Sequence, residues 1–301
     1  MTAIAIIDWL LFVFIAVSVV YVVVFATASL LPARYPAKDE TAQPHFLIII
    51  PAYKEDAVIL STVEAALQQD WRHASSNESH ASDRRFTVCV VADGMSNDTE
   101  ERLRSMPAVL LENQTSIHTK AHALQIAMKQ SYDPDRHTHV VILDADNIVA
   151  PDMLTRLAPY CTVEAVALQA HRCAKNTDTP IAILDAVSEE INNSIFRRGH
   201  NRLGLSSALI GSGMCFYAPW FAKAVCLLET AGEDKELERL LLAEGHYIAY
   251  LQDIDVLDEK VSNSNNFGQQ RRRWLAAQFH TLGEMVHDLP SAIRNSRIDY
   301  I

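Results

Sequence analysis

The chain has 301 residues and a formal net charge of −11, from 26 Lys or Arg against 37 Asp or Glu. A chain of this length can form one large α/β domain with a substantial core and further segments. The acidic balance argues against a nucleic-acid partner, because phosphate backbones are bound by clustered Lys and Arg. The five cysteines show no metal-ligand or redox spacing, so we expect buried thiols in a reducing compartment.

The N-terminal segment is strongly apolar, with no charged residue across 9–31. About 20 apolar residues are enough to cross a bilayer as a helix, so residues 1–31 are predicted to be a transmembrane anchor. A cleaved signal peptide is the competing interpretation, but the run is too long and Asp8 stands where Lys or Arg is expected. Arg34 and Lys38 follow the segment, so the positive-inside rule predicts that the remaining chain faces the cytoplasm.

A polar, Pro-containing linker (32–44) leads to the segment HFLIIIPAYKED. Its apolar run has the length of a strand, which we expect Pro51 to break, with Tyr53 and Glu55 in the loop that follows. The Ser- and His-rich segment 71–85 contains few apolar residues and is predicted to be a surface insertion.

A second predicted strand, 86–92, ends at Asp93 and is followed by Gly-Met-Ser-Asn-Asp-Thr. A strand, an Asp-Gly pair and then a helix are typical of a ligand-binding loop in α/β proteins, where sites gather at the carboxyl ends of strands. A tight turn is the alternative interpretation. The next predicted helix opens at Lys120, whose ammonium could meet a phosphate or be solvated.

The segment VVILDADNIVAPD, 140–152, combines a short buried strand with two closely spaced carboxylates. Asp144 and Asp146 are two residues apart in extended chain, so their side chains point to the same side. Like charges this close repel unless protons or a cation neutralise them, and carboxylates favour Mg2+ or Mn2+. Turn and helix-cap chemistry before Pro151 would also explain the pair, and both interpretations stay open.

Two further segments carry groups that could line a site. In LIGSGMCFYA, Gly211 and Gly213 allow backbone to approach a ligand closely, and a strand is expected next. In AGEDKELERLLLAEG, Glu233 and Asp234 occupy the first turn of a predicted helix, where the helix dipole favours acids. Capping alone would explain one acid at that position.

Strands that alternate with helices predict a mostly parallel sheet covered on both faces. A strand is expected near 163–169 and another over 246–252, the latter followed by a loop over 256–266. In QQRRRWLAAQFHTLGEMV, Leu275, Phe279, Leu282 and Val286 recur at helical spacing, which predicts an amphipathic helix. That helix should pack on the main domain or lie at the membrane surface.

The order of these motifs resembles the family 2 glycosyltransferases, which are inverting enzymes with the nucleotide-sugar fold called GT-A. The resemblance extends over 47–274 and rests on IIIPAYKED, VVADGMSNDT, KAHAL, LDADN, GSGM, GED and QRRRW. Each motif is weak evidence alone, whereas seven in order are specific. The closing Gln-x-x-Arg-Trp resembles the membrane β-glycosyltransferases, which include cellulose, chitin, hyaluronan and poly-N-acetylglucosamine synthases.

The resemblance implies a Rossmann-like GT-A domain over 45–260 and a Gln-x-x-Arg-Trp segment with an amphipathic interface helix over 261–301. It also implies roles at positions that match the family motifs. Residues expected at the nucleotide sugar are Pro51, Tyr53, Glu55, Asp93, Lys120, Asp144 and Gln270. Residues expected at the acceptor are Gly211, Gly213, Met214 and Trp274. Asp146 would hold the Mg2+ or Mn2+, Asp234 would be the general base, and Arg273 would stabilise the leaving diphosphate.

The implied function is transfer of a sugar from a nucleotide sugar, expected to be a UDP-sugar, to a glycan or lipid-linked acceptor at a bacterial inner membrane. Polymer-secreting relatives continue into further membrane helices, whereas this sequence has no second apolar run. Processive synthesis with translocation is therefore not expected, unless the sequence is a fragment or membrane partner subunits supply a channel. The alternative is a catalytically inactive nucleotide-sugar-binding partner of a glycan synthase. A phosphatase of the haloacid dehalogenase type is disfavoured, because its Asp-x-Asp belongs on the first strand of its domain.

Overall fold

The computed structural model describes residues 2–71, 84–230, 232–261, 264–295 and 297–300. Most of the predicted surface insertion therefore lies outside the described residues. The strands are β1 (Phe46–Tyr53), β2 (Phe86–Asp93), β3 (Val109–Glu112), β4 (His139–Ile142), β5 (Ile148–Val149), β6 (Ala167–Ala174), β7 (Met214–Tyr217) and β8 (Ile248–Asp258).

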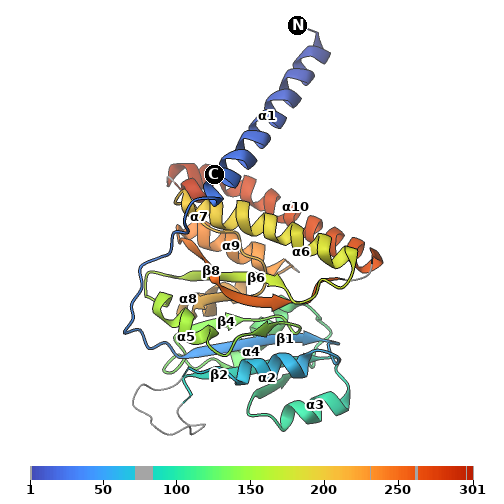
Figure 1. Cartoon of the computed structure of the whole chain (residues 1–301), viewed down its shortest axis with the longest axis vertical. Coiled ribbons are helices and arrows are strands. Elements are labelled where there is room, and N and C mark those ends of the chain that lie inside the picture. The colour runs from blue at the N-terminus through green and yellow to red at the C-terminus, as the bar shows by residue number, and fades with distance from the viewer. Residues whose placement is uncertain (1, 72–83, 231, 262–263, 296, 301) are drawn as a thin grey trace.

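Within the described ranges these strands form one eight-stranded sheet in the order β3-β2-β1-β4-β7-β6-β8-β5 (Figure 1). Strands β3, β2, β1 and β4 are parallel, and so are β6 and β8. Strand β7 is antiparallel to both of its neighbours, and β5 is antiparallel to β8. The predicted mostly parallel α/β sheet is confirmed.

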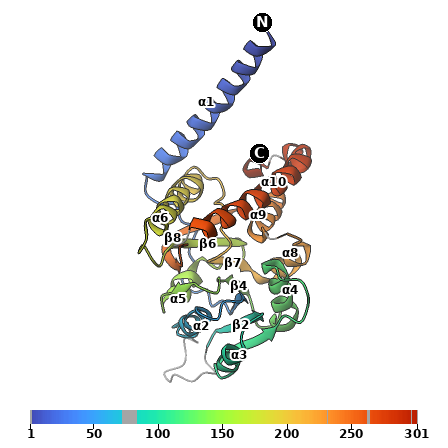
Figure 2. The same ribbon diagram turned by 90° about the vertical axis from the view of Figure 1, so that its right-hand side faces the viewer.

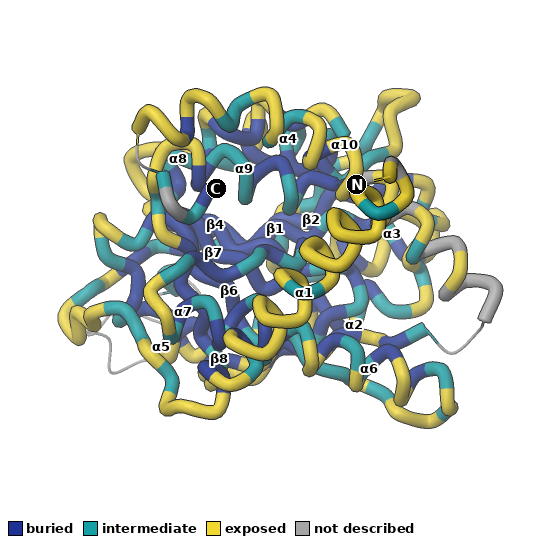
Figure 3. The backbone as a smooth tube through the Cα atoms, turned by 90° about the horizontal axis from the view of Figure 1, so that it is seen from above, coloured by how far each residue is buried: buried dark blue, intermediate teal, exposed yellow. Residues whose placement is uncertain are grey.

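Helices cover both faces of this sheet. They are α2 (Ile59–Leu67), α3 (Asn97–Arg104), α4 (Lys120–Ser131), α5 (Met153–Leu157), α6 (Pro180–Asn192), α7 (His200–Arg202), α8 (Ala218–Ala224), α9 (Glu233–Glu244) and α10 (Ser264–Arg294). Alternate residues of β1 enter opposite cores, as expected for a strand buried on both faces. Ile48 packs in the core with α2 and α5, and Leu47 packs in the core with α4, α8 and α9. Figure 3 shows the buried strands between exposed helices.

Strand β1 runs through Pro51 to Tyr53, so the expectation that Pro51 breaks the strand is wrong. Pairing between β1 and β4 ends where the N–H of Leu143 donates to the carbonyl of Ile49. In a parallel ladder the N–H and C=O of one residue point to the same neighbour, and successive residues alternate. Pro51, two residues after Ile49, therefore directs its missing N–H to the side where β4 has already ended.

Strand β8 continues to Asp258, so the loop predicted from residue 256 is wrong there. Ile254 and Val256 are buried between exposed residues, which is the alternation of a half-buried strand. The strand predicted near 163–169 likewise lies later, in β6, where it pairs with β8. Acidic residues at the outward positions of β8 made this part of the chain resemble a loop.

Helix α1 (Ala3–Ser29) is the one described helix that is long and apolar enough to cross a membrane. It projects from one end of the domain (Figures 1 and 2). Its last turns pack on a continuous helical segment in which α6 leads into the π-helix η3 (Asn193–Gly199) and then α7. Phe25 is buried there, and the hydroxyl of Tyr21 lies 2.6 Å from Nε2 of His200.

Close packing of α1 on η3 requires Gly199, because a Cβ there would lie 2.4 Å from the carbonyl oxygen of Phe25. We expect Gly199→Ala to lower the free energy of unfolding by about 1–3 kcal/mol, the usual cost of overpacking. Thermal unfolding of the detergent-purified protein would measure the change. Gly283→Ala is the matched control, because no atom lies within 4 Å of its Cβ position. Equal midpoints for the two variants would contradict the close contact.

Candidate active site

The carboxyl ends of β1 and β2 bring Tyr53 and Asp93 to one edge of the sheet, where His118 joins them. Nδ1 of His118 lies 2.9 Å from both carboxylate oxygens of Asp93. The amide of Asn113 donates to Asp93 at 2.8 Å. The ring of Tyr53 lies 5.3 Å from the ring of His118, at 31° to it. The sequence favours a solvated or core role for His118, because no carboxylate lies near it in the chain, whereas tertiary packing brings Asp93 to it.

Lys120 connects three elements that are distant in sequence. Its ammonium donates to Asp144 at the end of β4, lies 3.1 Å from Oε1 of Glu233 on α9, and donates to the carbonyl of Gly211 at 2.7 Å. Gly211 has a φ of 83°, a conformation that suits glycine. Three positions singled out in the sequence therefore meet around the ammonium of Lys120, itself a predicted site residue.

Burial raises the pKa of Glu233 to about 7, although Lys120 acts in the opposite direction. Burial also raises the pKa of Glu55, with a further contribution from the charge of Asp144. Glu55 is thus electrostatically coupled to the site. Asp234, beside Glu233, is partly exposed, and its Oδ1 accepts the backbone N–H of Lys235 at 2.9 Å.

Asp146 is partly buried, and its environment favours its neutral form. Burial first, and then the charges of Asp258 and Asp144, raise its pKa to about 7. A divalent cation would remove this penalty, because it neutralises adjacent carboxylates. Carboxylate oxygens are the ligands that Mg2+ and Mn2+ prefer, so Asp146 with the neighbouring Asp144 would suit such a cation.

Asn147 organises this carboxylate group and was not predicted as a functional residue. Its amide nitrogen donates to Asp146 and to Asp258, each at 3.1 Å. Its carbonyl oxygen accepts the backbone N–H of Asp144 at 2.9 Å and the hydroxyl of Ser212. The side chain is fully buried, so all of its bonding capacity goes to the site.

Two buried cations lie behind Asp258. Nε of Arg172 lies 2.6 Å from Glu189, and Nζ of Lys260 lies 2.9 Å from Asp258 and also contacts Glu189. Burial would raise the pKa of Asp258, but Arg172 and Lys260 outweigh it and lower that pKa. This ionic cluster has no motif in the sequence, because its members come from separate strands, a helix and a loop.

Of the residues predicted at the acceptor and the diphosphate, the structure describes the side chains of some but not of others. Gly213 lies under Val256 and Ala170, and Met214 is fully buried at the start of β7. Gln270, Arg273 and Trp274 fall within α10, but their side chains lie outside the described residues. Pro51 lies within β1 and is only partly exposed.

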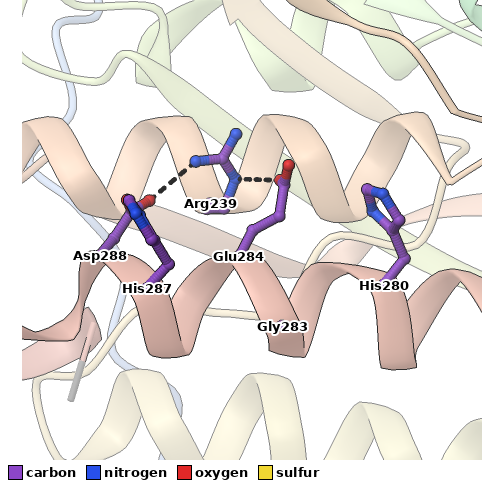
Figure 4. A pocket seen from close by; sticks show the side chains of 6 residues that line it. All are labelled: Arg239, His280, Gly283, Glu284, His287 and Asp288. Carbon is purple, nitrogen blue, oxygen red and sulfur yellow. Dashed lines mark hydrogen bonds and ion pairs between the residues drawn. The ribbon is translucent and has the colours of Figure 1, made fainter.

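Helix α10 is attached to α9, the helix that begins with Glu233 and Asp234. Arg239 of α9 lies 3.0 Å from Glu284 and 2.9 Å from Asp288, both on α10. A groove lined by these residues and by His280, Gly283 and His287 runs between the two helices (Figure 4). This groove shares no residue with the carboxylate site.

Among the described residues, one group of His, Cys and Asp ligand atoms lies within 4.8 Å: His171, Cys173 and Asp255. Nδ1 of His171 faces Asp255 at 2.8 Å, and Nε2 faces Glu190 at 2.9 Å. Both ring nitrogens are thus engaged by carboxylates. An ion-pair network accounts for the group without a metal.

Residues 44–277 match the family model described as Glycosyltransferase like family 2. A comparison with curated proteins finds no match. Among solved structures, the mannosyltransferase PcManGT from Pyrobaculum calidifontis, in complex with GDP-Man and Mn2+, is similar with a TM-score of 0.66 and 18% identity. That alignment covers 91% of this chain and 75% of the other.

The glucosyl-3-phosphoglycerate synthase from Mycobacterium tuberculosis, in complex with Mn2+, UDP-glucose and phosphoglyceric acid, has a TM-score of 0.55 and 17% identity. The alignment covers 84% of this chain and 88% of that one. At these identities the similarity is one of fold.

The raised pKa of Asp146 leads to a testable pH dependence. Without a cation, the folded protein keeps the proton of Asp146 at pH values at which the unfolded chain has already released it. The proton bound to Asp146 therefore favours the folded state, and its contribution to stability is fully present below the unfolded pKa of about 4. It is lost as the pH rises through the folded value of about 7. Mn2+ competes with that proton, so it should raise the unfolding midpoint more at pH 8 than at pH 6.

Thermal unfolding with and without Mn2+ would measure this difference. Asp146→Asn should abolish the pH dependence of the Mn2+ effect. Asp152→Asn changes an exposed acid at the start of α5 and should leave the effect intact. The same Mn2+ effect at both pH values in the unaltered protein would rule out Asp146 as a metal ligand.

Proposed function

This chain belongs to the family 2-like glycosyltransferases, and on that premise we propose that it transfers a sugar from a nucleotide sugar, with UDP-sugars as the first donors to test, to a glycan or lipid-linked acceptor. The observation that supports this most directly is the group formed by Asp144, Asp146 and Lys120 at the carboxyl edge of the sheet. Ligands of open α/β sheets bind at this edge.

The nucleoside would bind beside Tyr53, Asp93 and His118. The half-exposed ring of Tyr53 offers a flat face on which a base can stack. Asp93 is held in place by His118 and Asn113, so its carboxylate can accept hydrogen bonds from a base or a ribose. Pro51 and Glu55 are proposed to flank this position on the β1 side.

The diphosphate would bind near Asp146, which together with Asp144 would hold the Mg2+ or Mn2+. When bound, the cation would stabilise the negative charge that the leaving diphosphate gathers. Lys120 supplies a second positive charge at the same place. Gln270 and Arg273 are proposed to complete the diphosphate side, with Arg suited to a planar, bidentate contact.

Asp234 is the proposed general base. The carboxylate of Glu233 is engaged by Lys120, whereas Asp234 is partly exposed, so an acceptor hydroxyl can reach it. The base accepts the hydroxyl proton as the new glycosidic bond forms and the bond to the diphosphate breaks. Gly211, Gly213, Met214 and Trp274 are proposed to line the acceptor side.

We propose that α1 anchors the protein in the membrane and that the catalytic domain, 45–260, faces the cytoplasm, with a bacterial inner membrane as the expected location. The support is the length and apolarity of α1 together with Arg34 and Lys38 after it. The linker 32–44 then leads into the domain, and 261–301 completes it as the Gln-x-x-Arg-Trp segment with its helix.

The first experiment measures nucleotide release by the full-length protein in lipid nanodiscs, across UDP- and GDP-sugars, with Mn2+ or with EDTA. We expect release from one class of donor and its loss with EDTA, because the carboxylates require a cation to accept a diphosphate. Binding without release, with lipid-linked and glycan acceptors supplied, would favour an inactive partner of a glycan synthase. Absence of binding to any nucleotide sugar would contradict the proposed donor class.

Asp234→Asn tests the base. We expect turnover to fall roughly 10²–10⁴-fold, the usual contribution of general base catalysis, with nucleotide-sugar affinity retained. The control is Glu244→Gln at the other end of α9, which should keep full turnover. Near-normal turnover of Asp234→Asn would show that another group is the general base, and Glu233→Gln would then be the next variant to assay.

A further inference from the structure

A mixed group of ligand side chains lies where β6 and β8 pair, and it shares no residue with the carboxylate site. His171 and Cys173 are two residues apart on β6, so they point to the same side of the strand. Asp255 lies opposite His171 in the register of the parallel β6–β8 pair. One ligand atom from each of the three lies within 4.8 Å of the other two. Strand pairing thus brings together a nitrogen, a sulfur and an oxygen ligand.

The imidazole of His171 has the orientation of a metal ligand. Metal-bound histidines place one ring nitrogen on the metal and usually donate the other N–H to a carboxylate. Here Nδ1 faces Asp255 at 2.8 Å, and Nε2 faces Glu190 of α6 at 2.9 Å. With the hydrogen on Nε2, the lone pair of Nδ1 points toward Asp255. The ion pairs hold the group without a metal, and they also hold the ring in the orientation that a ligand needs.

A buried side chain fixes Glu190 in turn. Nδ2 of Asn193 lies 3.3 Å from Oε1 of Glu190 and donates to the carbonyl of Arg172 at 3.0 Å. Asn193 is buried, and Arg172 stands between His171 and Cys173 on β6. The carboxylate behind the imidazole is therefore tied to the strand that supplies two of the three ligands. Such partners of the ligands contribute to metal affinity.

The spacing of the ligand atoms suits a small tetrahedral ion after a modest adjustment. Zn2+ bonds of about 2.0–2.3 Å to N, O and S place neighbouring ligand atoms roughly 3.3–3.8 Å apart. The 2.8 Å between Nδ1 of His171 and Asp255 would then have to open by about 0.5 Å. The side chain of Asp255 is 59% exposed, so it can move, and an ion can enter from solvent.

The ligand types select a different ion from the one proposed at Asp146. Mg2+ and Mn2+ prefer oxygen ligands, whereas imidazole together with thiolate suits Zn2+. Binding would release the proton of the Cys173 thiol, because the thiolate is the ligand. The two sites would therefore take metals of different classes.

We propose that His171, Cys173 and Asp255 form a Zn2+ site whose fourth position is open to water, and that Glu190 positions His171 within it. The proposal does not depend on the proposed transferase activity. Bound Zn2+ would connect β6 to β8 directly after the irregularity in their pairing between Ala170 and His171. Through Glu190 it would also restrain α6, which packs on β6 (Figure 1).

This site would stabilise the strand that supports the carboxylate site. Arg172 lies between two of the proposed ligands, and its guanidinium pairs with Glu189. It also helps to lower the pKa of Asp258. The expected role of Zn2+ is thus structural, since it would restrain the backbone from which Arg172 projects.

Substitution by Co2+ tests the site on the full-length, detergent-purified protein, freed of metal and kept reduced by a phosphine. Tetrahedral Co2+ with a thiolate ligand gives a charge-transfer band in the near ultraviolet and d–d bands in the visible. Co2+ bound by carboxylates alone gives no thiolate band, so the site at Asp146 cannot produce this signal. We expect the band to saturate at one Co2+ per chain and to disappear when Zn2+ is added, because thiolate ligands select Zn2+.

Variants assign the ligands. Cys173→Ser should abolish the thiolate band, and His171→Gln should weaken Co2+ binding. Glu190→Gln should keep the band but lower the affinity for Co2+ about 10–100-fold, the usual effect of losing such a partner. Cys226→Ser is the matched control, because Cys226 is an exposed cysteine in the turn Val225–Leu227, outside β6 and β8.

Absence of a thiolate band in the unaltered protein would overturn the proposal and leave the group as an ion-pair network. A band that survives Cys173→Ser, or is lost in Cys226→Ser, would also overturn it. Unchanged affinity in Glu190→Gln would refute the positioning role of Glu190. Circular dichroism checks the fold of each variant, and if Cys173→Ser does not fold, the unaltered protein and His171→Gln still decide. Nucleotide release with Mn2+ is assayed separately, so failure of the Zn2+ site leaves the proposed transferase activity standing.

Discussion

The carboxylates of Asp258 and Asp144 repel that of Asp146, and the elements around them supply groups that reduce this repulsion. Lys120, from the first turn of α4, neutralises Asp144. Two buried cations lower the pKa of Asp258. Asn147 holds Asp146 close to Asp258 through its amide. Asp146 keeps a raised pKa, and a bound cation would compensate the charge of its carboxylate.

The same electrostatic requirement connects the site to the surface. Glu189 is needed beside Arg172 and Lys260, and it lies on the inner side of α6. Placing an acid inward forces the apolar residues of that helix outward, where water is an unfavourable neighbour. The charges of the site and the apolar surface of α6 are thus two consequences of one helix orientation, and neither can be changed without affecting the other.

Local patterns in the sequence predicted much of the sheet and the neighbourhood of the site. Apolar runs in the sequence identified the strands β1, β2 and β4. The acids that follow two of these runs, Asp93, Asp144 and Asp146, were predicted to be site residues. The bonds among these groups could not be predicted, because His118 and Asp258 are brought to them by tertiary packing. Pro51 and the second half of β8 were misjudged for a related reason, since neighbouring strands determine whether a proline or an alternating acidic segment can remain in a sheet.

The π-helix η3 between α6 and α7 has a consequence for how such proteins can vary. A π-helical turn accommodates one more residue than an α-helical turn, so it corresponds to a one-residue insertion in an otherwise α-helical segment. Losing that residue would rotate α6 by about 100° relative to the part that holds α1. The angular register between α1 and α6 therefore depends on a single residue, and length changes within 193–199 should be far less tolerated than substitutions there.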